Sequence, residues 1–565
     1  MGQDGANQPT GAEAMVQMLD SYEVEHVFGL CGDTSLPLYD AMVRLDHGIT
    51  HILTRDERHA AYMADAYARV TGKPGICEGP SGGGATYILP GLVEANESSV
   101  PILAITTDVA TTSAGRYPLT ELDQNAVMRP LTKWNGVIPS SGVLPRFLRR
   151  AFREMTTGRP GSVHLGLPFD VQKGPVDAGE VHTDPNHTHY PASQSAPAPA
   201  DIEAIATALM DARAPVIVCG GGVVLAGAMA ALQDVAEIAD IVVVTTVSGQ
   251  GSLAETHPNC AGVVGSNGGQ PATRAIVDEA DVVLFVGCRA GSVTTERWRS
   301  PGPDATIVHI DNDPAVIGAC YPTHAAAVGD AKAALELLAD AFRDGHVSQK
   351  GGAIRAHAAL RAKWPMFEAL AASSETPIKP ERVIASLQAN LPDDAVICAD
   401  PGTPCPYFSA WYRWPRAGRH FITNRAHGAL GYALGASIGA QIGRPNAKVV
   451  ACSGDGSFAM SVGELETITR YNLPITIIVF SNAVFGWIKA GQKSGFDARY
   501  FSVDFTRTDH AAVARAYGLK AWTVADPNAL NDVVRLAIRH DGPTLIDVIA
   551  QPLQDAAAPV SEWIA

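Results

Sequence analysis

Short apolar runs and helical patterns alternate along this chain of 565 residues. Near the N-terminus, residues 11–22 and 58–71 have helical periodicity, whereas residues 26–30 and 101–106 are apolar runs typical of buried strands. Comparable strand and helix patterns recur as far as the C-terminus. Because such alternation builds parallel sheets covered by helices, we expect an α/β protein with mainly parallel sheets.

The chain is too long for one hydrophobic core, and two segments divide it. Residues 178–201 are rich in Pro, Ala, Ser and His, as linkers are, and residues 345–380 form a helical and polar connector. We therefore expect three domains, at residues 1–180, 200–345 and 378–565. Strands are expected in the second at residues 215–218, 241–244, 282–286 and 306–310, and in the third at residues 395–399, 448–453, 475–480 and 544–548.

Polar side chains follow two of the predicted strands in the third domain. Asp455 comes directly after the first of them, within Gly454-Asp455-Gly456, and Asn482 comes after the second. A helical pattern lies between the strands, so they form a βαβ unit with both side chains at the carboxyl ends of neighbouring parallel strands. Oxygen ligands on a glycine-rich turn suit Mg²⁺ that also holds a diphosphate.

Glu57 lies where a strand pattern meets a helix pattern in the first domain. In an apolar pocket, a carboxylic acid there would have a raised pKa and could donate or accept a proton. The alternative is a solvated residue in the first turn of a helix, where a negative charge favours the helix dipole.

Composition narrows the classes of function and partner. The formal net charge is −16, which provides no basic face for nucleic acid or an anionic membrane, and no apolar run approaches the length of a membrane span. The start, Met1-Gly2-Gln3-Asp4-Gly5, has no basic and then apolar signal pattern. The nine cysteines are scattered and form no C-x-x-C pair. We expect a cytoplasmic protein with reduced thiols and a small-molecule substrate.

These features occur together with further motifs, Ser81-Gly82-Gly83-Gly84-Ala85-Thr86 and Gly428-Ala429-Leu430-Gly431 among them. In that combination nearly the whole chain resembles the acetolactate synthase family of thiamine-diphosphate (ThDP) enzymes. The resemblance implies pyrimidine-binding, central Rossmann-like and diphosphate-binding domains, in that order. It also implies ThDP and Mg²⁺ as cofactors, and a homodimer or homotetramer whose active sites are shared between subunits.

The resemblance assigns roles to individual residues. Glu57 would start cofactor activation by exchanging a proton with the aminopyrimidine ring, and Leu430 would bend the cofactor into a V shape. Asp455, Asn482 and the main-chain carbonyl of Val484 would hold Mg²⁺. The expected cofactor-binding residues are Glu57, Gly402, Thr403, Gly428, Leu430, Gly454, Asp455, Gly456, Ser457, Asn482, Val484, Phe485 and Gly486.

The expected substrate pocket departs from the synthase pattern. Thr120 stands where the family has Gln, Tyr87 where it has Asn, and Gly491 where a Trp shapes the synthase's acceptor pocket. Residues 289–293 replace a segment linked to FAD, which argues against FAD. Asp33 matches the catalytic Asp of pyruvate decarboxylase-like enzymes, or it caps the helix expected at residues 36–42. The candidates for handling substrate protons are Asp33, Thr34, Thr120, Glu121 and Gln492.

The substrate remains open among three readings. The first is an acetolactate synthase-like carboligase that acts on a 2-oxo acid through an enamine intermediate. The second is a 2-hydroxyacyl-CoA lyase or oxalyl-CoA decarboxylase, which residues 120–124 also resemble and which would bind ADP or CoA in the central domain. The third is another ThDP decarboxylase or hydrolase. A non-catalytic ThDP-binding subunit is the alternative from a different class.

Three local features bear on the choice of substrate. Gly220-Gly221-Gly222 after a predicted strand indicates either a nucleotide site or a tight turn in a vestigial Rossmann-like domain. Arg289, Arg297 and Arg299 could cluster at one edge of the central sheet. The tail at residues 551–565 carries Trp563 and is either a lid over the active-site mouth or a disordered end.

Overall fold

The computed structural model describes residues 8–563. The expectation drawn from Met1 to Gly5 therefore lies outside the described residues. Those described form two compact units. The first contains the chain up to Ser193 with residues 426–445 and 461–471, and the second contains residues 194–425, 446–460 and those from Asn472 on. Across them the fold contains three parallel six-stranded sheets, which confirms the expected α/β class.

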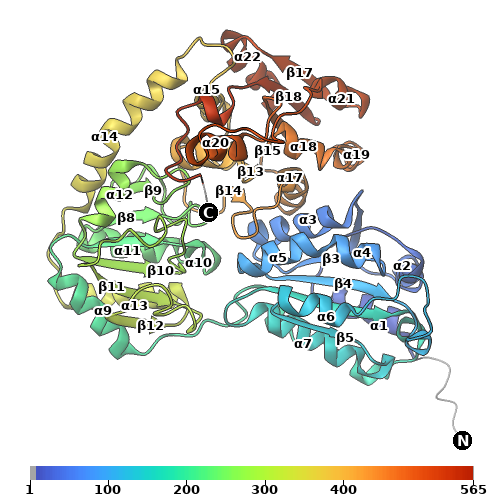
Figure 1. Ribbon diagram of the computed structural model, residues 1–565. Helices are drawn as coiled ribbons and strands as arrows, with labels where there is room; N and C mark the ends of the chain where they lie inside the picture. Colours follow the sequence, from blue (N-terminus) through green and yellow to red (C-terminus); the bar gives the residue numbers. More distant parts are fainter. Residues whose placement is uncertain (1–7, 564–565) are drawn as a thin grey trace, which may run out of the picture. The chain divides into compact units, whose positions relative to one another are not determined.

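The first unit is built on a sheet in the order β2-β1-β3-β4-β6-β5. Strands β3, β4 and β5 of this sheet are labelled in the blue to cyan part of Figure 1. α1, α2, α7 and α8 pack with one another beside this sheet, and α3 packs with α5 and with strands β1, β3 and β4. The strands are β1 (His26–Gly29), β2 (Thr50–Leu53), β3 (Gly75–Gly79), β4 (Ile102–Asp108), β5 (Trp134–Val137) and β6 (Ser162–Pro168). The helices are α1 (Gly11–Ser21), α2 (Leu36–Arg44), α3 (Glu57–Thr71), α4 (Gly83–Tyr87), α5 (Leu89–Glu97), α6 (Gln124–Met128), α7 (Leu144–Thr156), α8 (Phe169–Lys173), α17 (Tyr432–Gly443) and α19 (Leu465–Arg470).

Helix α17 lies unusually close to α3 because glycine recurs along it at every fourth position. A side chain at Gly435 would come within 2.9 Å of His59, and one at Gly439 within 2.0 Å of the carbonyl oxygen of Met63. Residues one turn apart on α17 thus meet residues one turn apart on α3 in the same direction, so the two helices run parallel. Their N-termini lie at the same end, which is the end that carries Glu57.

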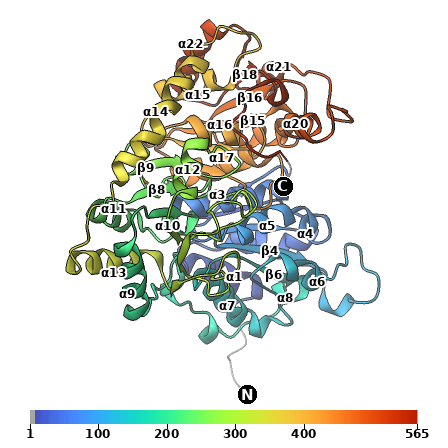
Figure 2. The same ribbon diagram turned by 60° about the vertical axis from the view of Figure 1, so that its left-hand side comes forward.

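The central sheet belongs to the second unit and has the order β12-β11-β10-β7-β8-β9. Its strands are β7 (Val216–Cys219), β8 (Val242–Thr245), β9 (Cys260–Val263), β10 (Val282–Val286), β11 (Thr306–Asp311) and β12 (Ala325–Val328). Its helices are α9 (Pro199–Asp211), α10 (Gly221–Leu225), α11 (Met229–Ala239), α12 (Pro271–Asp278) and α13 (Ala331–Asp344). The long helix α14 (Gly352–Ala371), yellow in Figure 2, contacts β8, β9 and α12 and then α15 of the next sheet, so it is the expected helical connector.

The third sheet has the order β14-β13-β15-β16-β18-β17. It consists of β13 (Val396–Ala399), β14 (Phe421–Thr423), β15 (Val449–Gly454), β16 (Thr476–Ser481), β17 (Lys520–Val524) and β18 (Thr544–Ile549). The accompanying helices are α15 (Pro380–Asn390), α16 (Pro404–Trp411), α18 (Asp455–Ala459), α20 (Gly486–Gly495), α21 (His510–Ala516) and α22 (Pro527–Ile538). The chain adds β14 on one side of β13 and β15 on the other, so the connections diverge between β13 and β15. That reversal creates a crevice at the carboxyl ends of the strands.

All the strands expected in the second and third domains are present, with ends that agree with the expected ones to within one residue. Of the nine cysteines, Cys31 is exposed, Cys320 is partly exposed and the rest are buried. None of the helices in the described part of the chain combines the length and the apolar character needed to cross a bilayer.

Candidate active site

Three neighbouring strands of the third sheet deliver the predicted diphosphate and metal residues to one edge. β13 leads to Gly402 and Thr403, β15 ends at Gly454 and leads to Asp455, and β16 leads to Asn482. Since all three strands are parallel and adjacent, their carboxyl ends meet at the crevice between β13 and β15. The structure therefore gathers residues that are far apart in sequence, as the βαβ reasoning predicts.

Asp455 is held rigidly at this edge. Its Oδ2 accepts hydrogen bonds from the backbone N–H groups of Asn482 and Ala483, at 2.7 and 2.6 Å, and its Oδ1 accepts one from Gly456 at 2.9 Å. Burial raises the pKa of Asp455 against the opposing effect of these three donors. A cation beside this carboxylate would offset the cost of its burial.

The same edge fits a metal that is shared with a diphosphate. A Cβ added to Gly402 or Gly454 would meet no atom within 4 Å, so the backbone here borders open space. In the described part of the chain no three His, Cys, Asp or Glu side chains gather into a metal site. Asp455, the Asn482 side chain and the Val484 carbonyl could supply only three hard oxygen ligands, so phosphate oxygens would have to complete the coordination of Mg²⁺.

Neighbouring side chains fix the loops that would contact the diphosphate. The Ser457 hydroxyl donates to Oδ2 of the buried Asp400 at 2.6 Å and so ties α18 to the end of β13. The Phe485 ring lies against Gly456, where a Cβ would approach it to 2.7 Å. Gly486 begins α20 directly after this segment, with Leu553 of the tail 3.4 Å from the position of its absent Cβ.

Glu57 is the first residue of α3 and is 5% exposed, so it is not the solvated helix-start residue of the alternative interpretation. Asp56 caps the helix by accepting the N–H of Arg58 at 2.8 Å. Close approach of the chain confines the Glu57 side chain, since a Cβ at Gly84 would lie 3.0 Å from its Oε1. Burial is the main cause of the raised pKa of Glu57, and the charges of Asp56 and Glu78 raise it further.

Gly428 and Leu430 belong to the same unit as Glu57. They lie in the loop that leads to α17, and Gly431 begins that helix with a left-handed φ of 88°. The loop is fixed by the N–H of His427, which donates to Glu94 at 2.8 Å. Because α17 runs parallel to α3, this loop and Glu57 share one end of the helix pair. Gly428 borders open space, and Leu430 is half-buried.

A chain of hydroxyl groups joins two of the predicted substrate residues. Thr34 hydrogen-bonds Ser81 at 3.1 Å and Thr107 at 2.8 Å, and Ser81 in turn hydrogen-bonds Thr120 at 2.7 Å. Thr120 has a φ of 70°, which is a strained conformation for a β-branched residue. Strain of this kind persists where the surroundings enforce it, and here it keeps the Thr120 hydroxyl on Ser81.

Carboxylates lie close to this hydroxyl chain. Asp33 is exposed and begins a short 3-10 helix at residues 33–35, and the residue before α2 is Ser35, so Asp33 is not the cap of that helix. Glu121 accepts the N–H of Gly115 at 2.6 Å. Asp108, at the end of β4, is 8% exposed, and burial with the nearby charge of Glu121 raises its pKa to about 6.

Gln492 lies on α20, in the second unit. Its amide donates to the carbonyl of Phe501 and accepts the N–H of the same residue, both at 3.1 Å. The side chain therefore fixes the segment after α20, and a substrate would have to compete for it. Nothing places Gln492 with the hydroxyl chain, because the two belong to different units.

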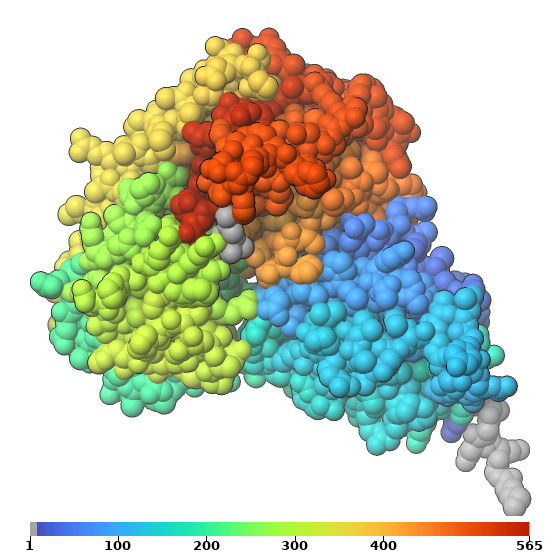
Figure 3. Space-filling model, viewed as in Figure 1, coloured from blue at the N-terminus to red at the C-terminus, as the bar shows by residue number. Residues whose placement is uncertain are grey.

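The C-terminal tail is ordered and rests on its own unit. Trp563 packs edge-on against Trp487 of α20, with ring centroids 5.1 Å apart. Glu562 forms ion pairs with Arg297 and Arg299 of the central domain. In Figure 3 the tail, coloured dark red, lies on the surface beside the orange-red segment that contains α20. The disordered-end interpretation is therefore wrong for the described residues of the tail.

In the central sheet, the switch point between β7 and β10 is filled by close contacts between glycines. A Cβ at Gly220 would lie 2.0 Å from the carbonyl oxygen of Gly287, and one at Gly222 would lie 2.7 Å from the Cα of Gly287. The turn after β7 is therefore pressed against the turn after β10. This geometry favours the tight-turn interpretation over a nucleotide site between these turns.

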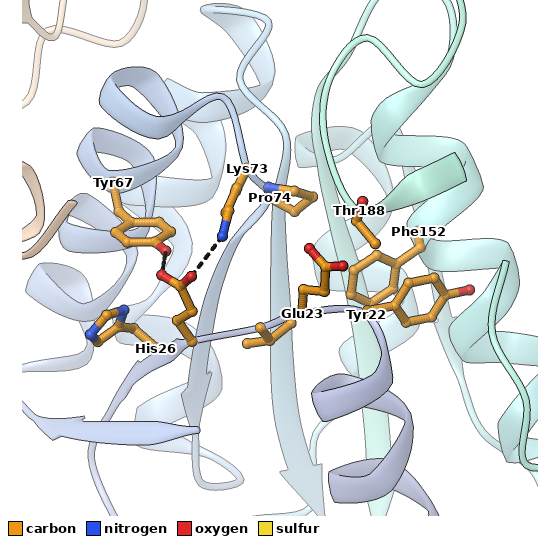
Figure 4. Close-up of a pocket in the computed structure, with 10 residues that line it drawn as sticks. Tyr22, Glu23, His26, Tyr67, Lys73, Pro74, Phe152 and Thr188 are labelled. Atoms are coloured by element: carbon orange, nitrogen blue, oxygen red, sulfur yellow. Dashed lines mark hydrogen bonds and ion pairs between the residues drawn. The ribbon is translucent and has the colours of Figure 1, made fainter. Parts of the chain in front are cut away.

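A separate small pocket occurs in the first unit (Figure 4). In it, Glu25 accepts hydrogen bonds from Lys73 at 2.7 Å and from Tyr67 at 3.2 Å. Its lining residues 22–26 lead into β1 and Pro74 leads into β3, so it lies at the amino ends of these strands. Ligands of open α/β sheets bind at the carboxyl ends, where Glu57 lies, and this pocket is not part of the candidate site.

Sheets of this topology, with the buried Glu57 after a strand of one sheet and Asp455 at the switch point of another, are typical of α/β enzymes that bind a phosphorylated ligand at the carboxyl ends of their strands. Three family models match the chain, each described as a domain of the thiamine pyrophosphate enzymes: the N-terminal TPP binding domain at residues 9–127, the central domain at residues 202–338 and the C-terminal TPP binding domain at residues 402–548. The chain belongs to the family of thiamine-diphosphate enzymes.

Curated relatives that are similar to nearly the whole chain are named as acetolactate synthase large subunits. A probable acetolactate synthase large subunit of Methanococcus aeolicus is 34% identical over 96% of this chain and 92% of its own length. The acetolactate synthase isozyme 2 large subunit of Escherichia coli is 31% identical over 96% of both chains. The acetolactate synthase large subunit of Lactococcus lactis is 32% identical over 96% of this chain and 93% of its own length.

Proposed function

We propose that this enzyme is a ThDP- and Mg²⁺-dependent carboligase of the acetolactate synthase type that acts on a 2-oxo acid. The observation that carries the proposal is the burial of Glu57, which raises the pKa of its carboxyl group, because cofactor activation requires a carboxyl group that can both give up and take back a proton. The names of the curated relatives support the reaction class.

One group of residues would bind and activate the cofactor, and a second group would act on the substrate. Bound ThDP supplies a nucleophilic carbon and an electron sink for making or breaking a carbon–carbon bond beside a carbonyl. Glu57 holds and returns the proton that this chemistry needs at the aminopyrimidine ring. Asp455, Asn482 and the Val484 carbonyl hold Mg²⁺, and the contacts to the diphosphate come from Gly402, Thr403, Gly456 and Ser457.

We assign substrate protons to the linked hydroxyl groups of Thr34, Ser81 and Thr120. Each hydroxyl both donates and accepts, so a chain of them can deliver a proton to a substrate oxygen without carrying a charge. Asp33 directly precedes Thr34, and Glu121 directly follows Thr120. These two carboxylates would set the charge around the substrate. Of these three residues, Ser81 was not predicted to be a site residue from the sequence alone.

The acyl-CoA alternatives receive less support. They require an ADP or CoA moiety in the central domain, where the turn at Gly220 is closed by Gly287. Arg297 and Arg299 are already paired with Glu562. FAD also remains without support, since the segment at residues 289–293 differs from the one linked to it in the resembled family.

Turnover by Glu57 variants tests the proposal. With ThDP, Mg²⁺ and pyruvate, the wild-type enzyme should release CO₂ and form acetolactate, and Glu57→Gln should lower kcat by about 100-fold to 10,000-fold. Glu154→Gln, which changes a half-exposed Glu of α7, is the matched control and should leave kcat unchanged. Full activity of Glu57→Gln would overturn the role of Glu57, and turnover of a 2-hydroxyacyl-CoA in place of pyruvate would overturn the substrate.

We further propose a homo-oligomer in which Glu57 of one subunit serves the Asp455 site of another. Mixing inactive Glu57→Gln and Asp455→Asn chains would then create sites free of both changes, and activity should return to about a quarter of the wild-type value. A site made within one chain would give no recovery. The term "large subunit" in the relatives' names leads us to propose a second, smaller type of subunit as well.

A further inference from the structure

A second carboxylate, Glu78, is buried near Glu57 in the first unit. It lies on β3 and is 1% exposed. Its side chain crosses Gly29 of β1, where a Cβ would come within 2.2 Å of Glu78 Oε1, so only glycine leaves room for it. Burying a charged group is costly unless the surroundings stabilise it, which indicates that this corner is built around the carboxylate.

Two polar side chains hold one oxygen of Glu78. The Tyr39 hydroxyl donates to Oε1, and His51 Nε2 lies 3.2 Å from Oε1 and 3.0 Å from the Tyr39 oxygen. Burial and the charge of Glu78 raise the pKa of Tyr39, so Tyr39 remains a donor and Glu78 an acceptor. Glu78 Oε2 is also buried, and no hydrogen-bond partner for it occurs among the residues that the structure describes.

Glu78 is electrostatically coupled to Glu57. The next residue along β3, Gly79, borders the Glu57 side chain, and a Cβ there would lie 3.2 Å from Glu57 Cγ. The charge of Glu78 contributes to the raised pKa of Glu57, after burial and alongside Asp56. The titratable groups that face this corner are Tyr39 of α2, His51 of β2, Asp56 and Glu57 at the start of α3, Cys31 after β1 and Cys77 of β3.

We propose that Glu78, fixed by Tyr39 and His51, is a positioning residue that keeps the catalytic proton on Glu57 until it is passed on. A negative charge close to Glu57 opposes the formation of a second carboxylate, so the proton-bearing form of Glu57 persists to higher pH. The inference rests on the proposed function, in which Glu57 exchanges that proton. It adds a role for three residues, Tyr39, His51 and Glu78, beyond those of the candidate site.

The direct test measures the proton on Glu57 itself. Infrared spectra of the full chain, titrated from pH 4 to 9, should contain the band of a protonated carboxyl group that is absent from Glu57→Gln and is thereby assigned. In Glu78→Gln this band should disappear at a pH lower by about half a unit or more, while Glu78→Asp, which keeps the charge, should restore the wild-type position. An unchanged titration of Glu57 in a folded Glu78→Gln protein would overturn the proposal.

Activity gives a second, independent measurement. The alkaline limb of the pH profile of kcat/KM should move to lower pH in Glu78→Gln by the same amount, whereas a merely structural role would lower kcat without moving the limb. If Glu78→Gln does not fold, Tyr39→Phe replaces it as the test variant. Loss of the Tyr39 hydroxyl makes the ionised form of Glu78 less stable, so the Glu57 band should shift in the same direction but by a smaller amount. Absence of pyruvate turnover in wild type, with the infrared shift present, would refute the proposed substrate and leave the coupling of Glu78 to Glu57 established.

Discussion

Oδ2 of Asp455 accepts the backbone N–H of Asn482 at 2.7 Å, which joins the end of β15 to the end of β16. The carboxylate therefore has two tasks. It shapes the loop that carries Asn482 and Val484, and it would provide the acidic side chain of the proposed Mg²⁺ ligand set.

The first prediction concerns Asp455. Asp455→Ala should weaken Mg²⁺-dependent ThDP binding by at least about 100-fold, because it removes a metal ligand and also the acceptor for three backbone donors. Isothermal titration with ThDP at saturating Mg²⁺ measures this loss. Asp497→Ala, which changes an exposed Asp of the same unit, should bind as wild type does. Equal affinities for the two variants would contradict the assigned metal site.

The position of Asp455 and Asn482 at the carboxyl ends of neighbouring strands could be predicted because polar residues and strand ends coincide in the sequence. Asp455 and Asn482 each follow a continuous apolar run, and both runs are interior strands, β15 and β16. The edge strands were harder to predict. β12 is mostly alanine, β14 has three residues and β17 begins with an exposed lysine, so none gives a long apolar run.

The residues that sequence reasoning missed depend on contacts between distant segments. Glu78 interrupts the apolar pattern of β3 and is stable there only because Gly29 and Tyr39 surround it. Ser81 acquires its role by bridging Thr34 and Thr120, which are 86 residues apart in the chain. A polar residue shortly after an apolar run, as Asp108 is two positions after residues 101–106, was the one signal available.

The second prediction concerns pH and Glu464. This carboxyl is fully buried, it accepts the N–H of Arg55 at 2.9 Å, and burial raises its pKa from the ordinary value of 4.5 to about 7. Because the folded state binds the proton more tightly than the unfolded state, the stabilisation is complete below pH 4.5 and is lost as pH rises through 7. The effect is of order 3 kcal/mol at most.

Glu464→Gln imitates the neutral acid and should remove this dependence. Urea midpoints measured from pH 4.5 to 8 should fall less steeply for the variant than for wild type. Glu154→Gln, which changes a half-exposed Glu of the same unit, should keep the wild-type slope. Parallel curves for Glu464→Gln and wild type would show that Glu464 is ionised throughout.

The third prediction concerns the tail. The N–H of Ser561 donates to the Ser266 carbonyl at 3.1 Å, next to the ion pairs of Glu562 with Arg297 and Arg299. Such partly exposed pairs contribute little to global stability, so the effect should be local. Glu562→Gln should speed amide hydrogen exchange at Ser561 by about 3-fold, and high salt should do the same in wild type. Glu336→Gln is the control. Unchanged exchange in Glu562→Gln would mean that the packing of Trp563 alone holds the tail.

The last prediction concerns the strained backbone at Thr120. Its φ of 70° costs a β-branched residue about 1–2 kcal/mol, which glycine would not incur. Thr120→Gly should therefore leave the melting temperature equal to wild type or above it, whereas Thr112→Gly, in the same loop and without a positive φ, should lower it. Activity should follow the opposite order. Thr120→Gly removes the hydroxyl that meets Ser81 and should lower kcat/KM by about 10-fold or more, while Thr120→Ser retains that hydroxyl and should keep most of the activity. If the Thr120→Gly variant were more stable than wild type and also fully active, the strain at Thr120 would have no function. The loop would then work equally well without the hydrogen bond between Thr120 and Ser81.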